Sequence, residues 1–501
     1  MDTNVLDWLE NTAKRQPDKW AFSDSNNSLS FSQVLTYAKR IGSKLCKATN
    51  SKRPVAVISG RHSLTPVAFL GVVYSGCFYA PLDGSMPLAR LNTMVKNLEA
   101  ELLIVDEKHL ELANKLDFSG KVLVLEELIN SDIDEEILSL RRGYSNEEDP
   151  LYVIFTSGST GVPKGVITSH KSLMCYIDAY SEVMGIDETD ILGNQSPLDY
   201  IAAIRDIYLP LKHGASTVII PKELYMTPGK LFDFLNENKI SAVGWSVSAL
   251  TLPVSLGAFD HVAPKYLKKV CFSGSVMPCS CLKIWQENLP DTKFVNQYGP
   301  TEATASCTYY VVDGLVKEED VLPIGRPYKH YRVFLLSEDN RETPQGEIGE
   351  ICVSGPTLAL GYYNNRELTG ASFMQNPLNQ SYHERIYKTG DLGLMRADGN
   401  LEFHGRKDRQ IKHLGHRVEL GEIELAAGKI PETGEVCVIY SKEKENLYLF
   451  YTGPVDKRKL ALGLREMLPG FMVPRKLMPI DSMPQLSNGK IDMQALRKYI
   501  N

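Results

Sequence analysis

An alternation of short apolar runs with longer amphipathic segments limits the fold of this chain most strongly. The short runs are rich in β-branched residues and include "RPVAVISG" from Arg53, "AELLIVDE" from Ala100 and "KVLVLEE" from Lys121. A segment of the second kind is "LTYAKRIGSKLCKA" from Leu35. Strands that alternate with helices in this way build layers with largely parallel sheets. The sequence therefore predicts an α/β protein.

The chain is long enough for more than one domain. Its 501 residues exceed what a single hydrophobic core usually organises. The clearest boundary is the charged segment "FHGRKDRQIKHLGHRVE" from Phe403, which leaves about 90 residues behind it. We expect a large N-terminal domain of layered sheets and helices over residues 1–407. A small α+β domain over residues 408–501 would follow it, joined by a hinge.

Charge and targeting signals exclude several classes of function. A formal net charge of -6 gives no general attraction for nucleic acid or for an anionic membrane surface. The N-terminus lacks the apolar core of a signal peptide. The most apolar window, "VAFLGVVYSGCFYAP" from Val67, is too short to cross a bilayer and predicts a buried helix followed by a strand. Nine cysteines without paired spacing favour reduced thiols. We expect a cytoplasmic protein that binds neither nucleic acid nor a membrane.

A loop rich in Ser, Thr and Gly, "FTSGSTGVPKG" from Phe155, carries the strongest chemical signal. Its hydroxyls and backbone N–H groups can donate to polyphosphate oxygens, its glycines permit close approach, and Lys164 adds positive charge. Gly165 follows the lysine where a Walker A loop would have Ser or Thr. The loop therefore indicates a phosphate site of another type, and its alternative is a flexible turn.

Four further motifs follow this loop. They are "NQYGPTEAT" from Asn296, "YKTGDLG" from Tyr387, "GRKDRQIKHLGHRVELGEIE" from Gly405 and "NGKID" from Asn488. In this order the motifs resemble the acyl-adenylate-forming superfamily. Within it the chain is most similar to stand-alone adenylation enzymes of nonribosomal peptide synthesis and to D-alanine–carrier protein ligases. "LSFSQVL" at Leu29 and "GEIGEICVSGPTLALGYYNN" at Gly346 extend the resemblance over nearly the whole chain, although Leu360 stands where the family usually has arginine.

The resemblance implies a site for ATP and Mg²⁺. In the family, the loop holds the β- and γ-phosphates, and Glu302 would help to hold Mg²⁺. Tyr298 would lie against adenine, Asp391 would accept hydrogen bonds from the ribose, and Arg406 would contact ribose and phosphate. The implied catalytic residues are Lys490, Glu302 and Thr156. The implied ATP-binding residues are Thr156, Ser157, Gly158, Ser159, Thr160, Lys164, Tyr298, Gly299, Thr301, Asp391, Arg406 and Lys490.

The resemblance also implies two half-reactions. In the first, a carboxylate attacks the α-phosphorus of ATP, and Lys490 with Mg²⁺ shields the two anions from each other. In the second, the small domain rotates about Asp408, and Gly415 leaves room for the pantetheine arm that carries the accepting thiol. About ten residues follow Lys490, too few for another domain, so we expect an acyl or peptidyl carrier protein in trans.

The stretch "SPLDYIAAIRDIY" from Ser196 matches the segment that lines the acyl pocket in the family. Amino-acid-activating relatives carry an aspartate for the α-ammonium group at the position of Ile201. That aspartate is missing here. The resemblance implies a substrate pocket formed by Ile201, Ala202, Arg205, Trp245, Cys271, Ser273, Gln297, Ala305 and Ser306.

These pocket residues disfavour an ordinary α-amino acid. An ammonium group buried against Ile201 would lose several kcal/mol of hydration without a counter-charge. Arg205 instead suits a carboxylate, and Trp245 offers a flat wall for a ring. We expect a small carboxylic acid without a conventionally bound α-amino group, aromatic or with a second acidic function. Alternatively, Arg205 points to solvent or is neutralised by Asp206, or Asp199 reaches an amine.

Three other functions compete with the adenylation and carrier-loading hypothesis. An acid–CoA ligase shares both half-reactions but needs a site for the CoA nucleotide. An amino acid–carrier protein ligase needs a group for the ammonium. A nucleotide-binding regulator or degenerate scaffold would not need the intact set of Lys164, Glu302, Asp391, Arg406 and Lys490, so this set argues against it.

Overall fold

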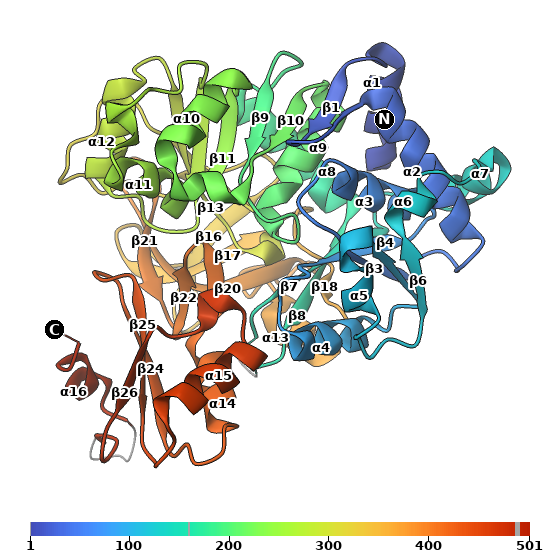
Figure 1. The fold of residues 1–501 in the computed structure, drawn as a ribbon. Helices are drawn as coiled ribbons and strands as arrows, with labels where there is room; N and C mark the ends of the chain where they lie inside the picture. The colour runs from blue at the N-terminus through green and yellow to red at the C-terminus, as the bar shows by residue number, and fades with distance from the viewer. Residues whose placement is uncertain (1, 159–160, 486–490, 501) are drawn as a thin grey trace.

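The computed structural model describes residues 2–158, 161–485 and 491–500. Figure 1 shows a large part that contains the N-terminus and a smaller part, coloured orange to red, that ends at the C-terminus. Strands and helices alternate through the first 300 residues, and the sheets there are mainly parallel. The predicted α/β fold class is confirmed.

One sheet of the large part has seven strands in the order β18-β8-β7-β4-β3-β5-β6. The strands β3 to β7 pair in parallel, whereas β7 and β8 form an antiparallel pair. Alternate residues of β3 pack into two different cores, so both faces of the sheet are covered and its central strands β3, β4 and β5 are apolar. The strands are β3 (Pro54–Ile58), β4 (Phe78–Leu82), β5 (Leu102–Val105), β6 (Lys121–Val124), β7 (Pro150–Thr156), β8 (Lys164–Ser169) and β18 (Gly361–Tyr362).

A second sheet has nine strands in the order β15-β14-β13-β12-β11-β9-β10-β1-β2. Its central strands are parallel, and antiparallel strands close both edges. The strands are β1 (Trp20–Ser23), β2 (Ser28–Ser30), β9 (Ile191–Asn194), β10 (Ser216–Ile219), β11 (Ala242–Ser246), β12 (Lys269–Ser273), β13 (Lys293–Tyr298), β14 (Thr308–Val311) and β15 (Arg326–Pro327).

A third, antiparallel sheet of five strands completes the large part and leads into the small one. Its last strand ends at Arg406, two residues before the predicted hinge residue Asp408. The strands are β16 (Arg332–Leu336), β17 (Ile348–Ser354), β19 (Phe373–Gln375), β20 (Arg385–Met395) and β21 (Leu401–Arg406).

Helices cover the faces of the two large sheets (Figure 1). The apolar window from Val67 forms a helix that is buried on all sides and then strand β4, as predicted. Within the described part of the chain, no helix is long and apolar enough to cross a membrane. The helices are α1 (Val5–Arg15), α2 (Phe31–Cys46), α3 (Leu64–Tyr74), α4 (Leu88–Leu98), α5 (Leu110–Ala113), α6 (Leu125–Leu128), α7 (Glu135–Gly143), α8 (His170–Met184), α9 (Ile204–His213), α10 (Pro228–Glu237), α11 (Val247–Ser255), α12 (Cys279–Asn288) and α13 (Arg366–Ser372).

The small part has its own core and two small sheets. A hairpin of β22 and β23 comes first, and a three-stranded sheet, β24-β25-β26, packs against α14 and α15 around a separate apolar cluster. We call residues 408–501 the small subdomain. Its elements are β22 (Gln410–His413), β23 (His416–Glu419), α14 (Leu420–Gly428), β24 (Val436–Ser441), β25 (Asn446–Tyr451), α15 (Lys457–Met467), β26 (Lys476–Pro479) and α16 (Met493–Arg497).

Candidate active site

The predicted phosphate loop connects β7 to β8. Thr156 ends one strand, Lys164 begins the other, and the two residues are paired across the ladder. Thr156 and Ser157 are buried, and the hydroxyl of Thr156 has no hydrogen-bond partner among the described residues. A Cβ on Gly158 would lie 2.1 Å from the Val162 carbonyl oxygen, so only glycine fits this turn. The predicted residues Ser159 and Thr160 lie outside the described residues.

Glu302 lies at the centre of a buried charge cluster. Both of its carboxylate oxygens accept hydrogen bonds from Nη1 of Arg417, each at 2.9 Å. The Tyr362 hydroxyl donates to Oε1 at 2.7 Å, and Nζ of Lys164 lies 3.5 Å from the same oxygen. Burial alone would raise the pKa of Glu302, but Arg417 and Lys164 outweigh burial and hold this pKa well below its usual range. The carboxylate is therefore ionised.

A second cluster holds the residues predicted to bind the nucleoside. Arg406 donates to Asp391 through Nη1 and forms a two-bond pair with Asp408, at 2.6 and 2.7 Å. The Tyr298 hydroxyl also donates to Asp391. Asp391 is buried, and protein donors already bond both of its carboxylate oxygens. The structure thus brings Tyr298, Asp391 and Arg406 together, with the predicted hinge residue Asp408 bonded to Arg406.

The turn between these clusters is closely packed. A Cβ on Gly299 would lie 2.5 Å from the Ser306 Cα, so a side chain there would collide with the backbone. Thr301 begins the 3-10 turn η5 (Thr301–Ala303), which also carries Glu302. This turn positions the glutamate and follows directly on strand β13, which carries Tyr298.

The hairpin of the small subdomain reaches into this site. Gly415 has a φ of +82°, and a Cβ on it would lie 3.3 Å from the Cβ of Ser246. The Ser157 hydroxyl donates to the Arg417 carbonyl oxygen at 2.8 Å. His416 stacks on Phe471, with ring centroids 3.9 Å apart, and faces Tyr200 of the large part. The predicted residue Lys490 lies outside the described residues.

Arg205 is buried rather than solvated, with 2% of its surface exposed. Its guanidinium donates to Gln297 Oε1 at 3.0 Å, to the Gly244 carbonyl oxygen at 3.0 Å and to the Ala202 carbonyl oxygen at 3.2 Å. It also lies 3.3 Å from Cys271 Sγ. No Asp or Glu oxygen of the described residues lies within 4.0 Å of the guanidinium. The positive charge is therefore buried without a carboxylate.

Asp206 follows Arg205 in the chain and could have neutralised it, but its carboxylate bonds Asn194 instead. It accepts a hydrogen bond from the Asn194 amide at 2.8 Å. Burial raises the pKa of Asp206 to about 6, although Arg205 lowers it. Asp206 therefore does not form the ion pair with Arg205 that one alternative required.

Four of the other predicted pocket residues lie around this arginine, namely Ala202, Cys271, Gln297 and Ser306. Cys271 faces Arg205 from strand β12, and the Ser306 hydroxyl lies 3.4 Å from Gln297 Oε1. Ile201 is 6% exposed and belongs to the 3-10 turn η2 (Ile201–Ala203), which precedes α9. Ala202 and Ala305 are partly exposed, as is Ser273 at the end of β12.

Trp245 differs from the other predicted pocket residues. Gly244 and Ser246 face Arg205 and Gly415, so strand alternation turns Trp245 to the opposite face of the sheet. There it is fully buried in a separate core, with Tyr225 edge-on to its ring. Its indole N–H donates to the Gly193 carbonyl oxygen at 3.0 Å. The structure does not place Trp245 beside Arg205.

Two functional residues escaped the sequence analysis. Arg417 belongs to the segment expected to face the site, but its contact with Glu302 was not foreseen. Tyr362 had no assigned role, yet it bonds Glu302 and its ring centroid lies 4.8 Å from Nζ of Lys164. Both residues lie inside quoted family motifs, Arg417 in "GHRVE" and Tyr362 in "LGYY", and these were the sequence signals that could have indicated them.

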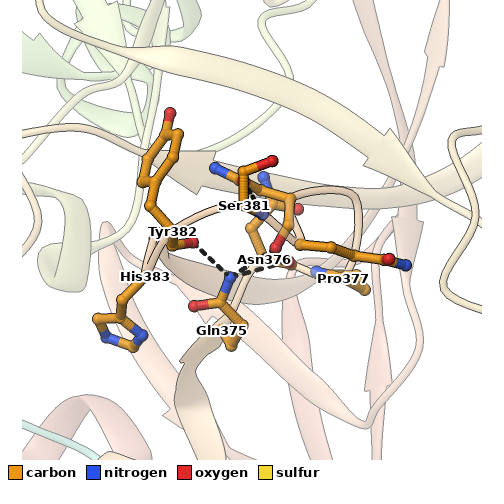
Figure 2. A pocket seen from close by; sticks show the side chains of 8 residues that line it. Gln375, Asn376, Pro377, Ser381, Tyr382 and His383 are labelled. Carbon is orange, nitrogen blue, oxygen red and sulfur yellow. Dashed lines mark hydrogen bonds between the residues drawn. The ribbon is translucent and has the colours of Figure 1, made fainter.

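A hollow of about 420 Å³ lies away from all these residues, in the loop between β19 and β20. Figure 2 shows the Gln375 amide at its centre, donating to carbonyl oxygens of the same loop. The loop satisfies its own polar groups, and none of the predicted site residues lines it. The hollow therefore has no part in the candidate site.

The fold and the site define an adenylate-forming ligase of the acyl-adenylate-forming superfamily. A family model described as "AMP-binding enzyme" matches residues 9–363, more than half of the chain, so the chain belongs to this family. It is 30% identical to zwittermicin A synthase ZmaJ of Bacillus cereus, over 99% of this chain and 95% of that protein.

Other relatives are much longer or show likeness of fold alone. Bacitracin synthase 1 of Bacillus licheniformis is 29% identical over 97% of this chain, but the chain spans only 9% of its length. The solved structure of holo-PA1221, a protein with adenylation and PCP domains, superposes with a TM-score of 0.83 at 23% identity. That superposition covers 99% of this chain and 84% of the other. It supports the fold described above.

Asp199 allows a test by pH. Burial and the neighbouring charge of Asp83 raise the pKa of Asp199 to about 7 from its ordinary value of 3.8. A group whose pKa rises on folding stabilises the protein at low pH and loses that contribution as pH rises. We expect Asp199→Asn to increase the free energy of unfolding by a margin that grows between about pH 4 and pH 7, reaching on the order of 1 to 4 kcal/mol.

Urea unfolding of both proteins at about pH 4.5 and about pH 8 measures this margin. A margin that is the same at both pH values would show that Asp199 does not titrate between them. The Asp190→Asn variant serves as the control, because Asp190 is a buried carboxylate paired with Lys269 at 2.6 Å. Its variant should lose stability at both pH values.

Proposed function

We propose that this ligase activates a small carboxylic acid as acyl-AMP, with release of pyrophosphate, and then transfers the acyl group to the phosphopantetheine thiol of a carrier protein. The acid has no conventionally bound α-amino group. It carries a second acidic function or another strong acceptor, with or without an aromatic ring. The guanidinium of Arg205, buried without a carboxylate partner among the described residues, is the observation that carries this choice of substrate.

Arg205 supports an anionic substrate because no carboxylate oxygen of the described residues lies within 4.0 Å of its guanidinium. A buried cation without a counter-charge is costly, and a carboxylate of the ligand would remove that cost. Its four contacts hold the guanidinium in one orientation, which suits recognition of a planar carboxylate. An ammonium group, in contrast, would meet Ile201 and the same positive charge. We therefore place the distinguishing group of the acid near Arg205.

The residues around the phosphate loop fit ATP. Thr156 and Lys164 lie beside each other on paired strands, and the Thr156 hydroxyl has no hydrogen-bond partner among the described residues. Lys164, which now lies 3.5 Å from Glu302, would turn from this carboxylate to a phosphate. Asp391 and Arg406 would exchange part of their mutual contact for the ribose. Lys490 would bridge the substrate carboxylate and the α-phosphate, by the resemblance of "NGKID" alone.

The same cluster fits a magnesium ion. Glu302 is ionised, and carboxylate oxygens with phosphate oxygens are the ligands that Mg²⁺ prefers. Bound there, the ion would neutralise charge on the pyrophosphate that leaves. Arg417 would have to release Glu302 to admit it, because its Nη1 now bonds both carboxylate oxygens.

The hairpin of the small subdomain supports the transfer step. Gly415 packs closely against Ser246, since a Cβ on it would lie 3.3 Å from the Ser246 Cβ. The missing side chain would spare room for a pantetheine arm once the hairpin shifts. The likeness to PA1221, whose adenylation domain is accompanied by a PCP domain, supports a carrier protein as the acceptor. We assign the hinge to Asp408, the first residue of the small subdomain, which accepts two hydrogen bonds from Arg406 at the end of the large part.

ATP–pyrophosphate exchange across a panel of acids tests this proposal. The panel contains benzoate, succinate, hexanoate, glycine and β-alanine, each with the full-length protein. We expect exchange with an acid that lacks an α-amino group. Strong exchange with glycine alone would contradict the substrate class, and no exchange with any acid despite ATP binding would favour a scaffold. Addition of free pantetheine and of CoA then compares the two kinds of thiol acceptor.

A further inference from the structure

One buried ion pair joins the small subdomain to the large part at a distance from every residue assigned above. Arg90 on α4 donates to Glu422 on α14 through Nη1. The two residues are 332 positions apart in the sequence. Their side chains are 8% and 1% exposed. The pair is thus buried at the interface between the two parts.

We propose that Arg90 and Glu422 are positioning residues for the thiol-transfer half-reaction, which rests on the proposed function. They hold the small subdomain in the orientation that presents the Gly415 hairpin to the active site. Neither residue touches the phosphate loop, Glu302 or the Arg205 pocket in the described part of the chain. Their effect on the reaction passes through the placement of the subdomain.

The link from this pair to the hairpin is short and stiff. Strand β23 ends at Glu419, and α14 begins at the next residue and carries Glu422 in its first turn. Fixing Glu422 therefore fixes β23, which carries Arg417 at the active site. Leu425 on the same helix lies against the phosphate loop, 3.4 Å from a Cβ placed on Gly161. Helix α14 thus connects the ion pair both to the hairpin strand β23 and to the phosphate loop.

The chemistry of the pair favours an orienting role over a stabilising one. Nε of Arg90 and Oε2 of Glu422 are buried and have no hydrogen-bond partner within residues 2–158, 161–485 and 491–500, so the one bond between Nη1 and Oε1 carries the interaction. Burying two charges for one bond gives little net stability. However, an orientation that buries only one of them is strongly disfavoured. The pair therefore selects the docked orientation of the small subdomain. Among orientations that bury these side chains, only this one pairs the two charges with each other.

The pair also differs from the contact of Arg417 with Glu302. Glu302 belongs to the phosphate cluster, so its loss affects the first half-reaction directly. Arg90 and Glu422 should affect only the second one. The experiment therefore compares the rates of the two half-reactions in each variant.

The test uses the full chain with Arg90→Gln, Glu422→Gln and the exchanged pair Arg90→Glu/Glu422→Arg. We expect each single variant to lower acyl transfer to free pantetheine about 10- to 100-fold, the range for loss of a hydrogen bond between charged groups. Pyrophosphate exchange should stay within about twofold, because the site itself is intact. The exchanged pair should recover most of the transfer rate.

Glu432→Gln is the matched control. Glu432 pairs with Lys459 at 2.7 Å within the small subdomain, and both side chains are about half exposed. Loss of such a pair has little effect, so both half-reactions should keep their rates.

Hydrogen exchange of the backbone gives a readout that needs no substrate. Amides of residues 410–419 should exchange faster in both single variants than in the wild type, and more slowly again in the exchanged pair. Unchanged protection of this hairpin would overturn the proposal, as would an equal loss of both half-reactions. Absence of pyrophosphate exchange in the wild type would instead contradict the proposed function, and hairpin protection would still decide the role of the ion pair.

Discussion

Glu302→Gln is expected to lower ATP–pyrophosphate exchange by about 100-fold or more, the scale for loss of a preorganised charged group at a reacting centre. The substitution keeps the shape of the side chain but removes its charge. Arg417 and Lys164 then share a buried site with no carboxylate between them, which disturbs the phosphate loop. The variant also loses an oxygen ligand for Mg²⁺, so the Mg²⁺ concentration for half-maximal exchange should increase.

The measurement is exchange as a function of Mg²⁺ concentration, with thermal unfolding of the same samples. Asp190→Asn again provides a buried, paired carboxylate outside the site. It should lose stability comparable to that of Glu302→Gln while keeping its exchange rate below the unfolding transition. Exchange that survives in Glu302→Gln with an unchanged Mg²⁺ requirement would remove Glu302 from the phosphate site.

The layered fold could be predicted because it depends on local patterns. The run from Arg53 contains β3, the run from Ala100 contains β5, and all but the last two residues of the amphipathic segment from Leu35 lie within α2. Each pattern reports the burial of one strand or one helix face. The phosphate loop could be located for the same reason, since its glycines and hydroxyls are adjacent in the chain.

The contacts between distant segments could not be predicted in this way. Arg417 and Glu302 are 115 positions apart, and nothing in the local sequence of either indicates the other. Their contact depends on where the small subdomain docks. The motif match placed both residues at the site. It did not show that Arg417 bonds the Glu302 carboxylate oxygens that were expected to hold Mg²⁺.

Trp245 shows a different limit of the sequence. Its alignment with a pocket position made it a candidate but did not show which way its side chain points. Successive residues of a strand point to opposite faces, so an error of one residue in the alignment reverses the direction. Here Gly244, not Trp245, lies on the face of β11 that packs against Arg205. A Cβ on Gly244 would lie 2.9 Å from the Arg205 Cζ, so the missing side chain leaves room for the guanidinium. The aromatic wall inferred for the substrate therefore lacks support from Trp245. The case for an acid with a second acidic function rests on Arg205 instead.

Arg205→Met is expected to lower kcat/KM by about 100-fold or more for whichever acid the wild type activates best. A site built to bond a polar group leaves buried partners unpaired when that group is lost, and this is the scale of such discrimination. Neutral acids of similar size should lose less or gain. The measurement is pyrophosphate exchange over the full panel, reported as the ratio between anionic and neutral acids.

Two further variants separate recognition from structure. Gly244→Ala keeps the charge but pushes the guanidinium from its position, so it should shift the same ratio by a smaller amount. Arg141→Met removes an arginine that also bonds main-chain carbonyl oxygens, those of Cys46 and Thr49, far from the pocket. It should lower stability without changing the ratio. If Arg205→Met behaves like Arg141→Met, the buried guanidinium supports the fold alone, and the acid must be selected by other residues of the pocket.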